Sequence, residues 1–287
     1  MKVTETIARR PTEPVIICDF SPPRGARPNA IEDARLLAAA DFISVAYLPG
    51  RVPRVDSAML GAAIKQQAGS DIVFNLATRD LNKLAMQSHL IGAQMLGLEN
   101  VVVVKGDGFS EKDQARVKDV SDYTPTQLIH AIGEMNGGRD FKGLKLRERT
   151  NFCVGATLDL NRGVAQEAAL THKKAAAGAD FFITQPVWSA DEVGAFHVAY
   201  EGAAGASLSQ PVFWGVQIFE QGGVIFSNIP GWVRTDLDNG RAGTDIALQV
   251  LAELRAAGHN NTYLVSPIIK GGARNYAAAQ AVLAAVG

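Results

Sequence analysis

The chain has 287 residues, of which 47% are hydrophobic, and its formal net charge of −1 gives no electrostatic footprint for nucleic acid or an anionic membrane. No apolar run is long enough to span a bilayer, and the opening MKVTETIARRPTEP lacks the apolar core of a signal peptide. The only two cysteines, Cys18 and Cys153, lie in apolar runs typical of buried free thiols, so we expect a cytoplasmic protein that binds neither nucleic acid nor membrane.

Short apolar segments alternate with longer stretches of helical character along the chain. In chain order, the predicted strands cover residues 15–20, 41–47, 71–76, 100–106, 151–157, 179–185, 211–217 and 261–267. Most are continuous apolar runs, which are typical of parallel strands covered on both faces. An amphipathic helix is predicted over 80–97, with Asp80 as a possible cap, Gly97 as its stop and an apolar face made of Leu81, Leu84, Ala85, Ile91, Met95 and Leu96.

Eight strands, each followed by helical material, favour a single (β/α)8 barrel that occupies residues 1–287 as one domain. A doubly wound sheet is the alternative, but regular units without an obvious second domain favour closure. Two connections, at about 106–150 and 218–260, are long enough for a helix and a loop over one face. Within the first, GGRDFKGLKLRER (137–149) is predicted to be an exposed polar excursion.

Polar residues gather where the predicted strands end, which is where a barrel of this class carries its function. They are Asp19, Tyr47, Asn75, Thr78, Arg79, Asp80, Lys105, Gly106, Asp107, Thr157, Asp159, Asn161, Thr184, Gln185, Gln217, Ser266 and Lys270. Their density predicts a site for a polar ligand. Taken singly, Asp19 and the KGDG stretch (105–108) also suit ordinary turns.

Several common sites are missing from the sequence. The five histidines show no metal-ligand spacing with cysteine or carboxylate, so we expect no metal site. No GxGxxG follows the first strand, and neither GxxxxGK[ST] nor GxSxG occurs. The usual dinucleotide loop, triphosphate loop and nucleophile elbow are therefore excluded.

Three stretches, in the right order, resemble the flavin-dependent 5,10-methylenetetrahydrofolate reductases, a family of (β/α)8 barrels. CDFSPPR (18–24) is similar to the family's Phe-Glu-Phe-Phe-Pro-Pro. NLATRDLNKLAMQSHLIGAQMLGLENVVVVKGD (75–107) resembles its strand–helix–strand segment that ends in Gly-Asp, and AAAGADFFITQPVW (175–188) its Ala-Gly-Ala-Asp and Thr-Gln-Pro run. The resemblance covers roughly 15–190 and assigns no role to 213–232.

This resemblance implies roles for individual residues. Asp19 falls on the general acid, Asp107 on an aspartate beside flavin and pterin, and Gln185 on a glutamine that contacts the folate. Gln217, at the end of the seventh predicted strand, is a further candidate for substrate binding and comes from its position, not from the resemblance. The implied cofactor is FAD, with NADH or NADPH as co-substrate and a tetrahydrofolate as substrate. Flavin-contacting positions are Asn75, Thr78, Lys105, Gly106, Asp107, Thr157, Asn161 and Lys174.

The chain departs from the family pattern at three places. The acid is Asp19 where the family has glutamate, Asn75 stands in place of a histidine, and TLDLNR (157–162) replaces a Tyr-Pro…His-Pro motif. A flavin-free reductase or methyl-transfer partner therefore stays open. So do a Schiff-base lysine at Lys105 or Lys270, and a barrel that only binds its ligand; the oligomeric state is also open.

Overall fold

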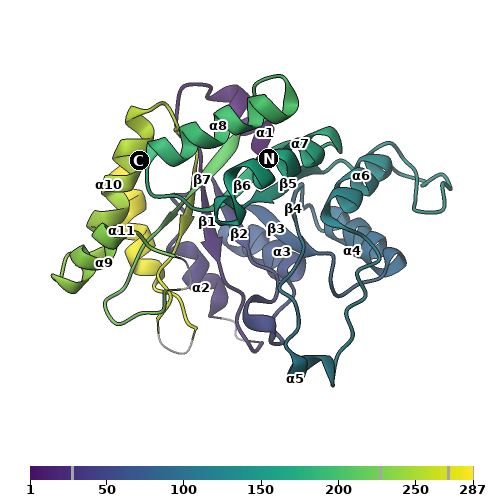
Figure 1. The fold of residues 1–287 in the computed structure, drawn as a ribbon. Helices are drawn as coiled ribbons and strands as arrows, with labels where there is room; N and C mark the ends of the chain where they lie inside the picture. The colour runs from purple at the N-terminus through teal and green to yellow at the C-terminus, as the bar shows by residue number, and fades with distance from the viewer. Residues whose placement is uncertain (27–28, 226–227, 270–271, 287) are drawn as a thin grey trace.

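The computed structural model describes residues 1–26, 29–225, 228–269 and 272–286. Its strands form one closed parallel barrel in which each strand pairs with the next and β1 pairs with β8 (Figure 1). The strands are β1 Ile16–Phe20, β2 Phe42–Val45, β3 Asp71–Ala77, β4 Asn100–Val104, β5 Cys153–Leu158, β6 Phe181–Pro186, β7 Val212–Gln217 and β8 Thr262–Val265. Closure confirms the predicted (β/α)8 barrel and excludes the doubly wound sheet.

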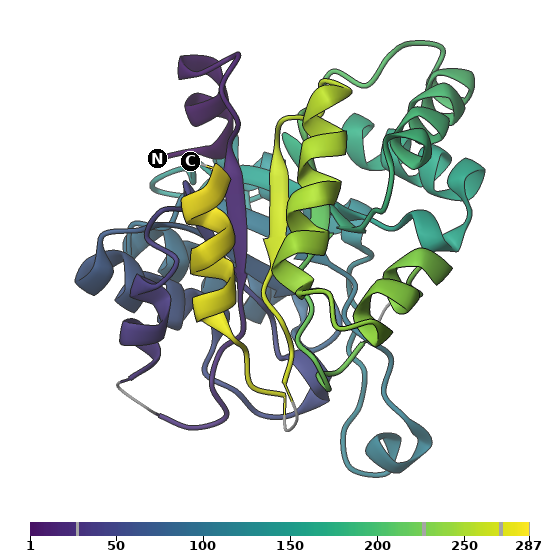
Figure 2. The ribbon, with the colours of Figure 1, turned by 90° about the vertical axis from the view of Figure 1, so that its left-hand side faces the viewer.

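Helices surround this barrel and fill its long connections. They are α1 Val3–Arg9, α2 Ala30–Arg35, α3 Ser57–Ala68, α4 Lys83–Met95, α5 Glu111–Gln114, α6 Pro125–Asn136, α7 Val164–Ala176, α8 Ala190–Ala204, α9 Gly231–Asp238, α10 Gly243–Ala256 and α11 Tyr276–Val286, with short 3-10 turns η1 Pro49–Arg51 and η2 Leu160–Arg162. Figure 2 shows α10 and α11 lying along the side of the barrel where β8 meets β1. None of these helices, within the described ranges, has the length and apolar character needed to cross a bilayer.

Alternate residues of each strand point into the barrel. At the amino end of the barrel these inward-pointing residues are apolar. Ile17, Phe42, Val73, Val102 and Phe213 belong to this inner cluster, which is separate from the larger core between strands and helices. Gly155 makes room for it: a Cβ there would lie 2.4 Å from the Phe181 ring. The same alternation fixes which residues face inward further along each strand.

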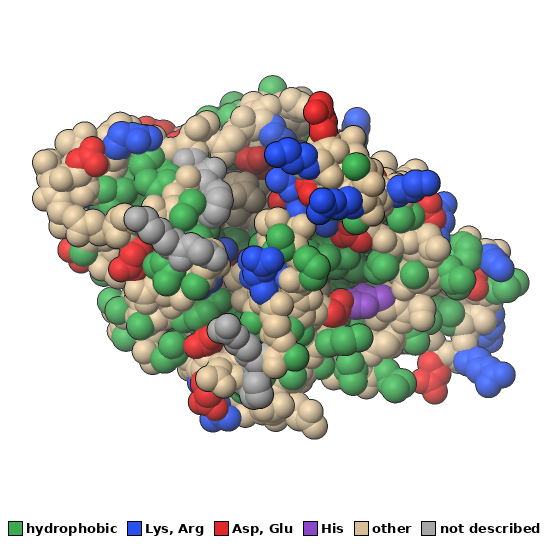
Figure 3. All heavy atoms as spheres, turned by 90° about the horizontal axis from the view of Figure 1, so that it is seen from below, with side chains coloured by type: hydrophobic (Ala, Val, Ile, Leu, Met, Phe, Trp, Pro, Cys, Tyr) green, Lys and Arg blue, Asp and Glu red, His purple; other side chains and the backbone are tan. Residues whose placement is uncertain are grey.

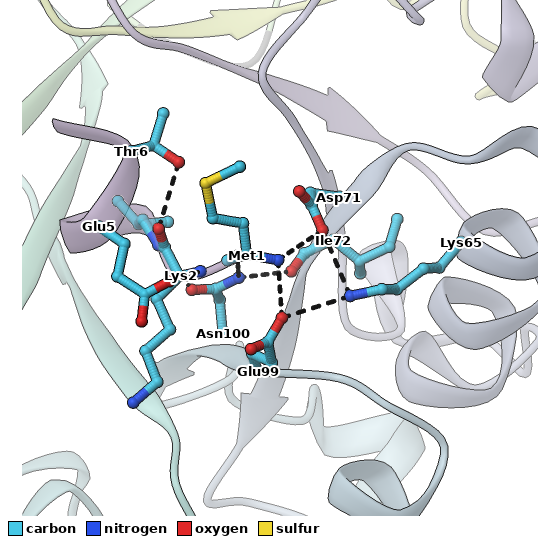
Figure 4. A network of polar contacts seen from close by, with 10 residues as sticks. Met1, Lys2, Glu5, Thr6, Lys65, Asp71, Ile72, Glu99 and Asn100 are labelled. Carbon is cyan, nitrogen blue, oxygen red and sulfur yellow. Dashed lines mark hydrogen bonds and ion pairs between the residues drawn. The ribbon is translucent and has the colours of Figure 1, made fainter. Parts of the chain in front are cut away.

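Helix α1 covers the amino end of the barrel and is tied to it by a polar network (Figure 4). The terminal ammonium group of Met1 lies 2.7 Å from Asp71 and 2.6 Å from Glu99. Lys65 approaches the same two carboxylates, at 3.3 and 3.4 Å. The amide of Asn100 donates to the Met1 carbonyl at 2.9 Å, so this end of the barrel is held closed by polar as well as apolar contacts.

The predicted face of the helix after β3 is wrong. Asn82, and not Asp80, caps α4 by accepting from the Ala85 amide, and the buried side is made by Met86, Gln87, Leu90 and Ala93. Leu84 is 65% exposed and Met95 86% exposed. This helix carries apolar residues on two faces, so helical spacing alone could not decide which face meets the strands.

Candidate functional site

The inner face of the barrel changes from apolar to polar toward the carboxyl ends of the strands. Asp19 follows Ile17 by two residues on β1, and Asn75 follows Val73 on β3. Asn75 Nδ2 donates to Ser44 Oγ at 3.0 Å and to the Val45 carbonyl at 2.8 Å. Period-two alternation thus brings polar side chains from neighbouring strands into one layer above the apolar interior.

Above this layer lies a cavity of about 670 Å³, hereafter the central cavity. Among its lining residues are Tyr47, Asn75, Arg79, Lys105, Gly106, Asp107, Thr157, Asp159, Arg162, Glu167, Lys174, Thr184, Gln185 and Tyr263. The carboxyl-end face is hollowed near its middle, with Lys and Arg side chains gathered beside the hollow (Figure 3). The size suits a small-molecule ligand.

The loop after β4 is held so that Asp107 stays exposed at the cavity wall. Gly106 has φ +83°, and a Cβ there would lie 3.2 Å from the Cβ atoms of Ala77 and Arg79, so any other residue would be strained at this position. Arg79 binds Asp80 through two hydrogen bonds of 2.7 and 2.8 Å and donates to the Asp107 carbonyl at 2.6 Å. These contacts fix the Asp107 backbone and leave its carboxylate available to a ligand.

A buried ion pair on α7 forms another part of the cavity wall. Lys174 Nζ lies 3.5 Å from Glu167 Oε1 and donates to the Thr157 carbonyl at 2.5 Å. Burial lowers the pKa of Lys174, and the Glu167 carboxylate partly offsets this. Glu167 Oε2 has no hydrogen-bond partner among the described residues, so it is a free acceptor beside the cavity.

Asp19 is not exposed to this cavity. It is 4% exposed, accepts a hydrogen bond from the Tyr263 hydroxyl at 3.0 Å, and pairs with Arg274 Nη2 at 2.9 Å. Burial, followed by the Asp19 charge, raises the pKa of Tyr263 well above its usual value. Because Tyr263 does line the cavity, it connects Asp19 to the cavity wall.

The structure thus divides the residues expected from the sequence. It brings Asn75, Lys105, Gly106, Asp107, Thr157, Lys174 and Gln185 together around the central cavity. It leaves Asp19, Thr78, Asn161 and Gln217 outside the lining: Thr78 is buried, and Asn161 is exposed and bonded to Asp159. Lys270 lies outside the described residues.

Glu167, Tyr263 and Arg274 contribute to this site or to the environment of Asp19, but they were not predicted from the sequence. Glu167 lies seven residues before Lys174 on the same face of α7, and this spacing was the available signal. Tyr263 sits inside the predicted strand 261–267, where alternation alone could have marked it as inward-facing. Arg274 lies beyond the last strand and gave no local signal that it would pair with Asp19.

The sequence profile of the methylenetetrahydrofolate reductases matches residues 3–225, more than half of the chain. The chain belongs to the methylenetetrahydrofolate reductase family. This confirms the resemblance seen in the sequence. The match also runs past residue 190, where the motifs become faint, and includes β7.

A search of curated proteins gives no match to this methylenetetrahydrofolate reductase family member. Among solved structures, an uncharacterised protein from Clostridium thermocellum, described as binding two copies of 5-methyl-5,6,7,8-tetrahydrofolic acid, has a TM-score of 0.67 and 12% sequence identity. The alignment covers 99% of this chain and 97% of the other. At that identity the likeness establishes a shared fold.

Proposed function

We propose that this protein interconverts 5,10-methylenetetrahydrofolate and 5-methyltetrahydrofolate, with reducing equivalents from NADH or NADPH and FAD as the carrier between them. The supporting observation is that Asp107 and Gln185, from the exits of β4 and β6, are both exposed and line the same cavity of a family member. The Clostridium thermocellum protein with this fold binds methyltetrahydrofolate, which supports the substrate class.

Asp107 and Gln185 suit the edge of a pterin ring. A pterin presents neighbouring N–H donors and a carbonyl acceptor, so a carboxylate can accept from the donors and a carboxamide can both donate and accept. Asp107 is the better partner for the N–H groups because its backbone is fixed by Arg79. Orienting the pterin in this way would hold the one-carbon unit above the polar layer of the barrel.

The proton needed when the imidazolidine ring opens is proposed to come from Asp19 through Tyr263. Asp19 lies behind the cavity wall, and its 3.0 Å contact with the Tyr263 hydroxyl is the route to the cavity. In the structure the phenol donates to Asp19. On the proposed route this hydrogen bond reverses: a proton on Asp19 passes to the phenol oxygen while the phenol gives its own proton to the bridging nitrogen. The methylene carbon then accepts a hydride and becomes the methyl group.

A bound flavin would supply hydride transfer between nicotinamide and folate. Of the positions expected to contact it, Lys105, Gly106, Asp107 and Thr157 line the cavity, and exposed Lys105 could pair with a phosphate. Asn75 also lines the cavity, but its amide is bound to β2. Lys105, Gly106, Asp107 and Thr157 are therefore placed to contact a flavin, whereas the Asn75 amide is already engaged with the protein.

One observation favours a second candidate, direct hydride transfer from nicotinamide to folate without flavin. Lys174 is bound to Glu167 and to the Thr157 carbonyl. Asn161 does not line the cavity, and its side chain is bound to Asp159. Two expected flavin contacts are therefore engaged with the protein itself. Both candidates share the same substrate and the same cavity.

Absorbance and turnover of the purified protein separate these possibilities. The proposal expects NADH- or NADPH-dependent reduction of methylenetetrahydrofolate by protein with a flavin band at about 450 nm, either as purified or after reconstitution with FAD. Turnover by colourless protein that retains no FAD would select direct transfer. Absence of turnover in both forms, with no binding of 5-methyltetrahydrofolate, would overturn the proposed function.

The Asp19→Asn variant tests the proton route. It should abolish folate reduction while leaving oxidation of the nicotinamide by an artificial acceptor largely intact. Tyr263→Phe should reduce folate turnover in the same assay, because it removes the hydroxyl between Asp19 and the cavity. Unchanged folate turnover in both variants would remove them from this role.

A further inference from the structure

A second cavity, of about 620 Å³, opens beside the exit of β1. We name it the arginine cavity because Arg24, Arg54 and Arg274 line it. Asp19 lies between the two cavities, since one carboxylate oxygen meets Tyr263 of the central cavity and the other meets Arg274. The function proposed above makes no use of this second cavity.

Two of the three guanidinium groups are held in place by backbone carbonyls. Arg54 donates from Nε to the Pro49 carbonyl at 2.9 Å and from Nη1 to the Pro22 carbonyl at 2.7 Å. Arg274 donates from Nη1 to the Ser266 carbonyl at 2.9 Å. Because their orientations are already fixed, little side-chain entropy would be lost when they bind a ligand.

Arg24 differs from these two residues. Its side chain is exposed and makes no hydrogen bond or ion pair with any described residue. It follows Pro22 and Pro23, whose rings restrict the backbone that carries it. The Arg24 guanidinium therefore lies at the cavity with no hydrogen-bond or ion-pair partner among the described residues.

Among the described residues, only one of the three arginines in this cavity, Arg274, is paired with a carboxylate, and that carboxylate (Asp19) lies outside the lining. Asp33 is its one carboxylate among the described residues, and none of the three arginines pairs with it there. Burial lowers the pKa of Arg54, and the charges of Arg24 and Arg274 lower it further. An anion in the cavity would relieve this repulsion between like charges.

We propose that the arginine cavity is a binding site for an anionic group of the phosphate or carboxylate class. Planar guanidinium groups bind either class through paired N–H donors. The anion would share Arg274 with Asp19, so this site is joined to the candidate proton route by one side chain. The inference does not depend on the proposed function, because binding can be measured without folate turnover.

Calorimetric titration of the full-length protein with inorganic phosphate, at constant ionic strength set with chloride, tests the site. We expect saturable binding that Arg24→Gln weakens about tenfold, the loss typical of one charge-assisted contact. Arg9→Gln, at the opposite end of the barrel, removes the same charge and should bind phosphate as the wild type does. Because Arg24 has no partner in the described structure, its variant should fold normally.

Two further probes identify the source of the anion. Tighter binding of ADP than of triglutamate would assign the site to a nucleotide phosphate, and the reverse would assign it to a glutamyl carboxylate. Arg274→Lys keeps the charge but loses the planar fork, and it should also weaken the preferred probe. No saturable binding at constant ionic strength, or an equal loss of binding in Arg24→Gln and Arg9→Gln, would overturn the proposal.

Discussion

Asp19 and Asp107, two acidic residues at strand ends of this barrel, have opposite environments. Asp107, after β4, is exposed at the central cavity, and Arg79 holds only its backbone. Asp19, near the end of β1, is 4% exposed and bound through both oxygens to Tyr263 and Arg274. The same local signal, an acid where a strand ends, therefore produces one carboxylate available to a ligand and one engaged with the protein.

The difference comes from what each carboxylate meets. The loop around Asp107 turns at Gly106, and the side chain is exposed at the central cavity. Asp19 points inward, where β8 presents Tyr263 and the segment after β8 presents Arg274. We therefore expect Asp107 and Gln185, at the exits of β4 and β6, to contact the ligand. We expect Asp19 and Tyr263, on β1 and β8, to supply the proton.

Removal of Asp19 should be the most damaging change to the folded state. Asp19→Ala leaves Arg274, which is 12% exposed, without its carboxylate, and breaking such a pair typically costs about 3–5 kcal/mol. Urea denaturation measures the loss, with Asp107→Ala as the matched control that should hardly change the free energy of unfolding. Equal losses in the two variants would contradict the contrast between a bound and an open carboxylate.

Gly106→Ala should destabilise the protein less. The added Cβ would meet Ala77 and Arg79 at 3.2 Å on a backbone with φ +83°, and strain of this kind costs about 1–3 kcal/mol. Gly108→Ala is the control, because a Cβ there meets nothing within 4 Å. Thermal or urea unfolding should separate the two variants, and an equal response would remove the special role of Gly106.

The alkaline stability of the Asp19 side should depend on Tyr263. Burial raises the pKa of Tyr263 above that of an unfolded tyrosine, so above about pH 10 the unfolded chain loses a proton that the folded chain keeps. Wild-type stability then falls with pH by up to about 1.4 kcal/mol per pH unit from this group.

Tyr263→Phe lacks this titration, so its free energy of unfolding should approach that of the wild type as the pH rises above about 10. Urea denaturation of both proteins between neutral and alkaline pH measures the gap. A constant gap across this range would show that Tyr263 has the same pKa in the folded and unfolded chain.

Asp107→Asn should have the smallest effect on stability, within about 0.5 kcal/mol, because the exposed side chain is not bound by the protein. The same variant should bind 5-methyltetrahydrofolate about tenfold more weakly, since it loses one charge-assisted hydrogen bond. Titration calorimetry gives the affinity. Unchanged affinity would separate Asp107 from pterin recognition.

Much of the architecture could be predicted because it depends on local pattern. Each predicted strand overlaps an observed one, and the polar exits of β3 to β6 do meet around one cavity. The outward face of α4 was not predictable, since its two apolar faces differ only in what packs against them. Gln217 illustrates the same limit: its position at the end of β7 is confirmed, but it is buried outside the cavity lining.

The sequence alone determined the barrel, the end at which polar side chains gather and the family to which the chain belongs. Tertiary structure decided that the Asp107 carboxylate is open and the Asp19 carboxylate is bound. Strand periodicity is local and can be read from neighbouring residues. The partners of Asp19 come from β8 and from the segment after it, so only closure of the barrel brings the first and last strands together and fixes the environment of that acid.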